Sequence, residues 1–79
     1  MKLNFQKGDL VEYVGSYSTA FWNFDGTQLA GIIDKGSIFM LCEVTQRVRN
    51  GLLTCQILTP DGTFGKFACE PSELTQAKI

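Results

Sequence analysis

The chain has 79 residues, seven basic and eight acidic, with a net charge of −1 and 44% hydrophobic residues. This composition predicts one folded domain over residues 1–79 and excludes a disordered chain. The basic residues are spread along the chain, which disfavours a nucleic-acid binder that depends on many phosphate contacts.

The cysteine content and the hydrophobicity pattern indicate in which cellular compartment the protein is expected. The chain has three widely spaced cysteines, Cys42, Cys55 and Cys69, and no histidine. This odd number and wide spacing disfavour both a disulfide framework and a zinc site. The N-terminal residues lack the apolar segment of a signal peptide, and no stretch reaches transmembrane length. We therefore expect a cytoplasmic protein with buried free thiols and no metal, cofactor or membrane contact.

The first predicted strand covers residues 9–14, where apolar and polar positions alternate. A long connection follows from Gly15 to about Lys35, and it contains four aromatic residues: Tyr17, Phe21, Trp22 and Phe24. A tight turn at Asp25-Gly26 allows residues 19–24 and 27–33 to pair as a small ribbon. In that ribbon Phe21 and Asn23 point to one face and Trp22 and Phe24 to the other, so that one pair would cap the barrel and the other would stay exposed. We expect Trp22 on the contact face, because its indole N–H needs a polar partner.

The second half alternates with period two and predicts a hairpin. One face is expected to carry the core residues Ile38, Met40, Cys42, Val44 and Val48. Asn50-Gly51 is typical of a two-residue type I′ turn, which would place Val44 opposite Ile57. A turn at residues 59–63, a strand around residues 64–69, a helical turn beginning at Pro71 and a short closing strand complete the chain.

This order of elements resembles a known class of small barrels. The segments "FQKGDLV" (5–11) and "DGTFGKFACEPSEL" (61–74) look like the opening and the ending of SH3-like barrels of the KOW, Tudor and bacterial SH3 kind. The resemblance implies an all-β, five-stranded SH3-like barrel with a long loop after the first strand and a single helical turn before the last. It also implies a small bacterial or phage protein, which in the phage case would act in the host cytoplasm.

The residues that usually carry catalysis are missing or scattered. The chain has no histidine and no glycine-rich phosphate-binding motif, and no spacing pairs two of the carboxylates at positions 25, 34, 61, 70 and 73. We therefore expect no enzymatic activity.

The hypothesis that remains is a binding module or small regulator that contacts a protein partner through its aromatic loop. Its candidate contact residues are Tyr17, Trp22, Phe24, Arg47 and Arg49, because tryptophan, tyrosine and arginine concentrate interface energy. One alternative is nucleic-acid binding, with aromatic rings stacking on bases while Arg47, Arg49 and Lys66 contact phosphates. Two others are an aromatic cage for a methylated side chain, as in Tudor-like barrels, and self-association through an edge strand.

Overall fold

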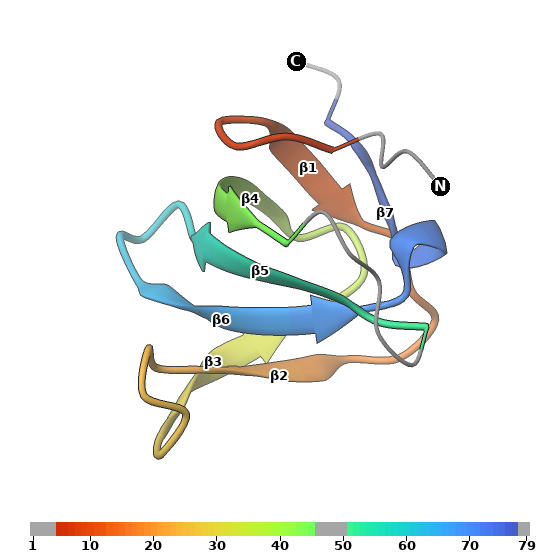
Figure 1. Cartoon of the computed structure of the whole chain (residues 1–79). Helices are drawn as coiled ribbons and strands as arrows, with labels where there is room; N and C mark the ends of the chain where they lie inside the picture. Colours follow the sequence, from red (N-terminus) through yellow and green to blue (C-terminus); the bar gives the residue numbers. More distant parts are fainter. Residues whose placement is uncertain (1–4, 46–50, 78–79) are drawn as a thin grey trace.

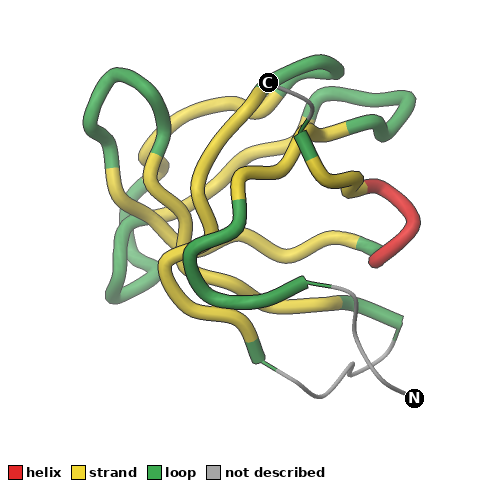
Figure 2. Tube along the Cα trace, turned by 90° about the horizontal axis from the view of Figure 1, so that it is seen from above, coloured by secondary structure: helices red, strands yellow, loops and turns green. Residues whose placement is uncertain are grey.

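The chain folds as one antiparallel β-sheet that curls around a common interior (Figures 1 and 2). The structure is a computed structural model and describes residues 5–45 and 51–77. In this part of the chain, seven strands and one 3-10 turn follow one another: β1 (Leu10–Tyr13), β2 (Thr19–Trp22), β3 (Leu29–Ile33), β4 (Ile38–Val44), β5 (Leu53–Leu58), β6 (Phe64–Cys69), η1 (Pro71–Glu73) and β7 (Leu74–Gln76). The strand order in the sheet is β3-β2-β6-β5-β4-β1-β7.

The all-β class and the helical turn before the last strand are confirmed, whereas the closed five-stranded barrel is wrong. Over the described ranges the sheet has seven strands and is open, with β3 and β7 as its two edges. The additional strands come from the connection between residues 15 and 35. The predicted ribbon exists there as β2 paired with β3, and β2 also pairs with β6. The aromatic segment is therefore part of the sheet and not a loop beside it.

The hairpin of β4 and β5 has a different register from the predicted one. Val44 lies opposite Cys55, not Ile57, and Leu41 takes the position opposite Ile57. The pairing shifts between Leu41 and Glu43, where β4 contains a β-bulge. Gly51 has the positive φ of +77° that a tight turn requires, while its predicted turn partner Asn50 and the predicted strand residues 46–49, Val48 among them, lie outside the described residues.

The bulge also explains which residues of β4 are buried. Phe39 and Leu41 are buried, whereas Ile38 and Met40, which were expected in the core, point outward with 40% and 37% of their surface exposed. An extra residue in one strand breaks the strict inside–outside alternation, so a single phase cannot describe the whole of β4. The predicted apolar face of this strand is therefore wrong in its first half.

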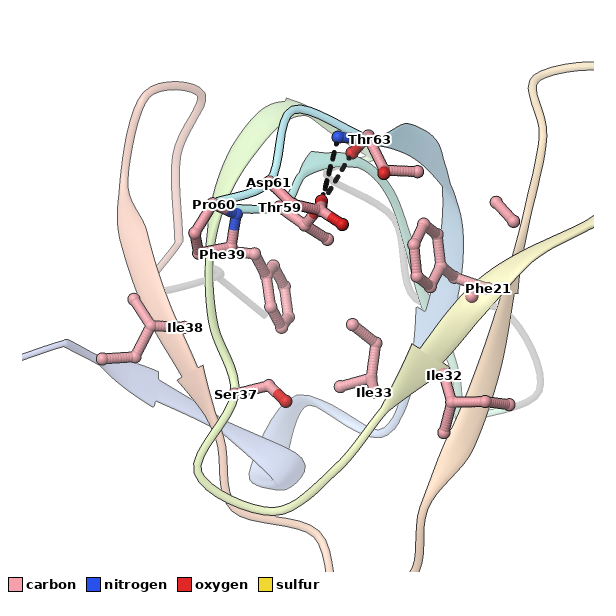
Figure 3. A pocket seen from close by; sticks show the side chains of 12 residues that line it. Phe21, Ile32, Ile33, Ser37, Ile38, Phe39, Thr59, Pro60, Asp61 and Thr63 are labelled. Atoms are coloured by element: carbon pink, nitrogen blue, oxygen red, sulfur yellow. Dashed lines mark hydrogen bonds between the residues drawn. The ribbon is translucent and has the colours of Figure 1, made fainter.

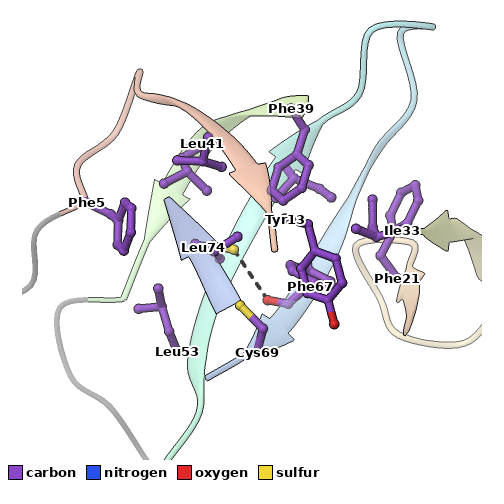
Figure 4. Packing of buried hydrophobic residues seen from close by; sticks show 13 residues of the cluster. Phe5, Tyr13, Phe21, Ile33, Phe39, Leu41, Leu53, Phe67, Cys69 and Leu74 are labelled. Atoms are coloured by element: carbon purple, nitrogen blue, oxygen red, sulfur yellow. Dashed lines mark hydrogen bonds between the residues drawn. The ribbon is translucent and has the colours of Figure 1, made fainter. Parts of the chain in front are cut away.

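Within the described residues, the interior of the curled sheet is formed by hydrophobic residues, with the Tyr13 hydroxyl at its border (Figure 4). Phe67 lies at its centre and makes edge-on ring contacts with Tyr13 and Phe39, at centroid distances of 5.9 and 5.7 Å. Leu53, Cys55 and Ile57 of β5 are buried around it, as the alternation predicts. These contacts concentrate aromatic surface in the core of a short chain, where few residues are available to form one.

Hydrogen bonds of the Tyr13 and Glu73 side chains connect β1 with η1 and with the segment before β2. The Tyr13 hydroxyl donates to the Tyr17 carbonyl oxygen at 2.8 Å and lies 3.1 Å from Oε2 of Glu73. The Oε1 atom of Glu73 accepts the Glu70 backbone N–H at 2.9 Å, which fixes the first turn after β6. Burial, followed by the neighbouring Glu73 carboxylate, raises the pKa of Tyr13. One side chain thus ties β1 to both η1 and the start of the aromatic segment.

Candidate functional site

Phe21 and Trp22 occupy opposite faces of β2. Phe21 is 3% exposed, whereas Trp22 is 45% exposed. The Phe21 ring enters the core between two glycines: a Cβ at Gly31 would lie 2.6 Å from the ring and one at Gly65 would lie 2.5 Å from it. Because neither neighbouring strand carries a side chain there, the ring fits, and Trp22 is directed to the outer face.

Trp22 belongs to a group of exposed apolar side chains on the outer face of β3, β2 and β6. Phe24 and Phe64 contact each other with a centroid distance of 5.9 Å. Leu29 lies opposite Trp22 in the β2–β3 pair, and Ile32 of β3 is 54% exposed. We call these five residues the aromatic face: Trp22, Phe24, Leu29, Ile32 and Phe64.

The turn that carries Phe24 is held in place by its own polar side chains. The carboxylate of Asp25 accepts hydrogen bonds from the backbone N–H and hydroxyl of Thr27, at 2.9 and 2.6 Å. The Asn23 side-chain oxygen accepts the same N–H at 3.0 Å, and Gly26 has a φ of +75°. These hydrogen bonds lower the pKa of Asp25, the side-chain bond from Thr27 having the largest effect. These local hydrogen bonds stabilise the turn that holds Phe24 on the protein surface.

The exposed apolar surface continues across the sheet beyond β6. Phe64 lies opposite Leu58 of β5, Leu58 opposite Met40 of β4, and Met40 opposite Leu10 of β1. Paired residues point to the same side of a sheet, so these four side chains form a row across four strands. Phe64 and Met40 are exposed, whereas Leu58 and Leu10 are partly buried. Contiguous apolar patches on a protein surface often mark binding sites.

The structure brings together some of the residues predicted for partner binding but not all of them. Trp22 and Phe24 share the outer face, as predicted. Tyr17 is 84% exposed but precedes β2, at the opposite end of that strand from Trp22. Arg47 and Arg49 lie outside the described residues.

Sequence reasoning missed Leu29, Ile32 and Phe64 as members of the site. The alternation "FGKFAC" of β6 contains the necessary signal for Phe64, since it shares a phase with Lys66 and opposes Phe67. Leu29 and Ile32 share a face only because the β2–β3 register shifts beside Trp22, and a register shift has no reliable sequence signature.

A cleft of about 400 Å³ opens on the other side of β3 (Figure 3). Phe21, Ile33 and Phe39 point toward it from β2, β3 and β4, and the turn between β5 and β6 borders it. β3 and β4 are joined by a short turn, in which the Ser37 N–H donates to the Asp34 carbonyl oxygen at 2.9 Å, but they do not pair. The two strands diverge from this turn and leave the cleft between them.

Two of the three thiols, those of Cys55 and Cys69, are poor nucleophiles near neutral pH. Burial raises the pKa of both Cys55 and Cys69 to about 12, so both remain protonated near neutral pH. Cys42 is partly exposed, not buried as expected, and all three are free. Across residues 5–45 and 51–77, no three His, Cys, Asp or Glu side chains are grouped so that they could hold a metal ion. The same residues include no helix of the length and hydrophobicity needed to cross a membrane.

Comparisons of the chain with protein-family models, with curated proteins and with solved structures find no match.

Proposed function

We propose that the protein is a non-enzymatic binding module that contacts a protein partner through the aromatic face. The observation that carries this proposal is the outward position of Trp22, with Phe24 and Phe64 in ring contact beside it. Aromatic side chains bury a large area with little loss of side-chain entropy, and tryptophan is among the residues most enriched in interface hot spots. The indole N–H also favours a surface where a polar partner is available.

The shape of the site favours a protein over a small ligand. The aromatic face extends over three strands and continues as the apolar row of Phe64, Leu58, Met40 and Leu10. Protein interfaces are broad surfaces of this kind, with an apolar centre and a polar rim, whereas small-molecule sites are deep and concave. Trp22 would supply the central anchor and Tyr17 a peripheral contact.

Nucleic-acid binding is the second candidate, and one observation favours it. Lys66 lies directly opposite Trp22 in the β2–β6 pair, so a cation stands beside an exposed aromatic ring. Single-stranded nucleic acids are bound by rings that stack on bases next to cations that contact phosphates. The net charge of −1 opposes this reading.

A pull-down from the native cell lysate distinguishes the two candidates. The wild-type chain is immobilised and exposed to lysate with and without nuclease. We expect the same proteins to be retained in both cases. Loss of all binding after nuclease treatment would contradict the protein-partner proposal and support the second candidate.

Two variants then test whether the aromatic face is the surface used. Trp22→Ala is expected to weaken binding of the retained partner by about 2 kcal/mol or more, the size of a hot-spot truncation. Leu52→Ala is the matched control, because Leu52 is 41% exposed but precedes β5, at the end of the strand away from Phe64. Equal effects of the two substitutions would show that the partner binds elsewhere.

A further inference from the structure

The two edges of the sheet are protected very differently. β7 is three residues long; Leu74 is buried, and the exposed residues Thr75 and Gln76 are polar. β3 has the sequence Leu-Ala-Gly-Ile-Ile, five apolar residues with no charge and no proline. Natural proteins usually protect an exposed edge with charged residues, proline or a very short strand. β3 has none of these devices; its pairing with β2 has a register shift, which is a further way to make an edge irregular.

The backbone of β3 offers hydrogen bonds on its free side. The Asn23 N–H donates to the Gln28 carbonyl oxygen at 2.9 Å at the start of the ribbon, while the Gln28 N–H donates to the Asn23 side-chain oxygen at 3.3 Å. Along an antiparallel strand the backbone N–H and C=O groups point alternately toward and away from the neighbouring strand, so a strand with one neighbour leaves part of them unpaired. Within the described residues, β3 has β2 as its only neighbour in the sheet.

The cleft follows this free edge. Four consecutive residues of β3, from Ala30 to Ile33, line it, and Ser37 with the first two residues of β4, Ile38 and Phe39, lines the opposite side. Its volume of about 400 Å³ lies within the range of ligand-binding pockets. Phe21, Ile33 and Phe39 form the apolar floor of the cleft and are at most 3% exposed, so every second side chain of an extended chain added to β3 would enter the cleft mainly beside the partly exposed residues Ala30, Ser37 and Thr59.

Charge at the cleft indicates what the added chain carries. Among the described residues that line the cleft, Asp61 is the one with a charged side chain. Its carboxylate accepts the Thr63 N–H at 3.2 Å and the Thr59 hydroxyl, which fixes it in the turn between β5 and β6. Hydrogen bonds from these threonines lower the pKa of Asp61, so its carboxylate keeps its negative charge to a lower pH than an ordinary aspartate does. A basic side chain on the ligand would complement this charge.

We propose that β3 binds an extended peptide segment of a partner protein as an added strand, with alternate apolar side chains in the cleft and a lysine or arginine near Asp61. Backbone hydrogen bonds along β3 supply affinity and the cleft supplies selectivity, as in other cases of strand addition. This site lies along the free edge of β3; it shares Ile32 with the aromatic face but does not include Trp22, Phe24 or Phe64. It can therefore fail without affecting the proposal for the aromatic face.

Selection from a displayed library of random eight-residue peptides, with the full chain as bait, tests the proposal. We expect enriched sequences with apolar residues at alternate positions and one basic residue. A synthetic peptide of the enriched sequence is then titrated into the isotope-labelled protein, and amide resonances are followed by NMR. The largest shifts are expected at Ala30, Gly31 and Ile33, from Ser37 to Phe39 and in the turn around Asp61.

Two matched comparisons make the result specific. N-methylation of the peptide amides that face β3 is expected to weaken binding about tenfold or more, because it removes backbone donors, while methylation of the intervening amides has less effect. Asp61→Asn is expected to weaken binding about two- to fivefold, the range for an exposed ion pair. Asp25→Asn is the control, since Asp25 lies in a similar Asp-Gly-Thr turn that does not border the cleft.

Several results would overturn the proposal. These are the absence of any enriched sequence, shifts confined to the aromatic face, and equal binding of both methylated peptides. Equal weakening by the Asp61 and Asp25 substitutions would overturn the charge assignment. A concentration-dependent dimer in sedimentation experiments, with resonance changes along β3 on dilution, would show that a second copy of the chain occupies this edge instead.

Discussion

The inner and outer faces of the β2–β3 ribbon carry similar residues in opposite situations. Phe21 is enclosed by the core and by two glycines of the neighbouring strands, whereas Trp22, the next residue, is 45% exposed among other apolar side chains. The difference shows that hydrophobicity alone does not decide which aromatic residue is buried. Space on the adjacent strands decides it, and here Gly31 and Gly65 provide that space on one face only.

Removal of the inner ring should have the largest effect. Phe21→Ala is expected to lower the free energy of unfolding by about 3 to 5 kcal/mol, the range for large-to-small changes in a core. Small domains are stable by only about 5 to 15 kcal/mol, so the variant should be largely or partly unfolded. Thermal unfolding followed by circular dichroism measures this. An unchanged melting temperature would show that the ribbon does not pack against the core as described.

A methyl group at Gly65 should reveal the space that Phe21 needs. The added Cβ would lie 2.5 Å from the Phe21 ring and 2.5 Å from the Trp22 carbonyl oxygen, so the backbone of β2 would have to move. We expect Gly65→Ala to cost about 1 to 3 kcal/mol of unfolding free energy, as overpacking does. Ala68→Gly, at an exposed position on the same strand, should cost about 0.5 to 1 kcal/mol through backbone entropy alone. A smaller effect at position 65 than at position 68 would contradict the enclosure of Phe21.

The ribbon and its two faces could be predicted from the sequence because the signals are local. Asp25-Gly26 marks the turn, and period-two alternation then separates Phe21 from Trp22 and Phe24. The buried positions of β5 followed in the same way. These elements need no knowledge of distant parts of the chain.

Other features depend on contacts that the local sequence does not specify. The pairing of β2 with β6 joins residues more than 40 positions apart, so the ribbon was not recognised as part of the sheet. The bulge near Cys42 inverted the expected burial of Phe39 and Met40. The cleft beside β3 arises from the divergence of two strands that follow each other in sequence, which no motif indicates.

The three cysteines differ in burial and should therefore differ in their reactivity toward thiol reagents. Cys42 is partly exposed and should react first with a thiol reagent in the native protein, whereas Cys55 and Cys69 should react only on unfolding. The Cys42→Ser variant serves as the control that identifies the first thiol. Rapid reaction of all three in the native state would contradict the burial of the inner pair.

The same thiols predict a pH dependence. Their pKa values of about 12 in the folded chain exceed the ordinary value of 9.0, so the unfolded chain loses these protons at a lower pH than the folded chain does. Their contribution to stability is therefore complete below about pH 9 and is lost as the pH rises toward 12. Urea unfolding of the wild type and of Cys55→Ala across this range checks the effect, and the variant should lose less stability than the wild type.

Trp22→Ala should have the smallest effect on stability. Since Trp22 packs on the outer face, we expect a loss of about 1 kcal/mol or less, in contrast to the loss for Phe21→Ala. The two variants should therefore separate clearly in melting temperature. Similar losses for both would show that the indole supports the core.

The accessibility of Trp22 tests the central claim most directly, because the chain has a single tryptophan and its fluorescence reports on one position. We predict a red-shifted emission that acrylamide quenches efficiently in the free folded protein, and protection from quenching when the retained partner is bound. A blue-shifted emission that resists acrylamide in the free protein would place Trp22 in the core and contradict the assignment of the aromatic face.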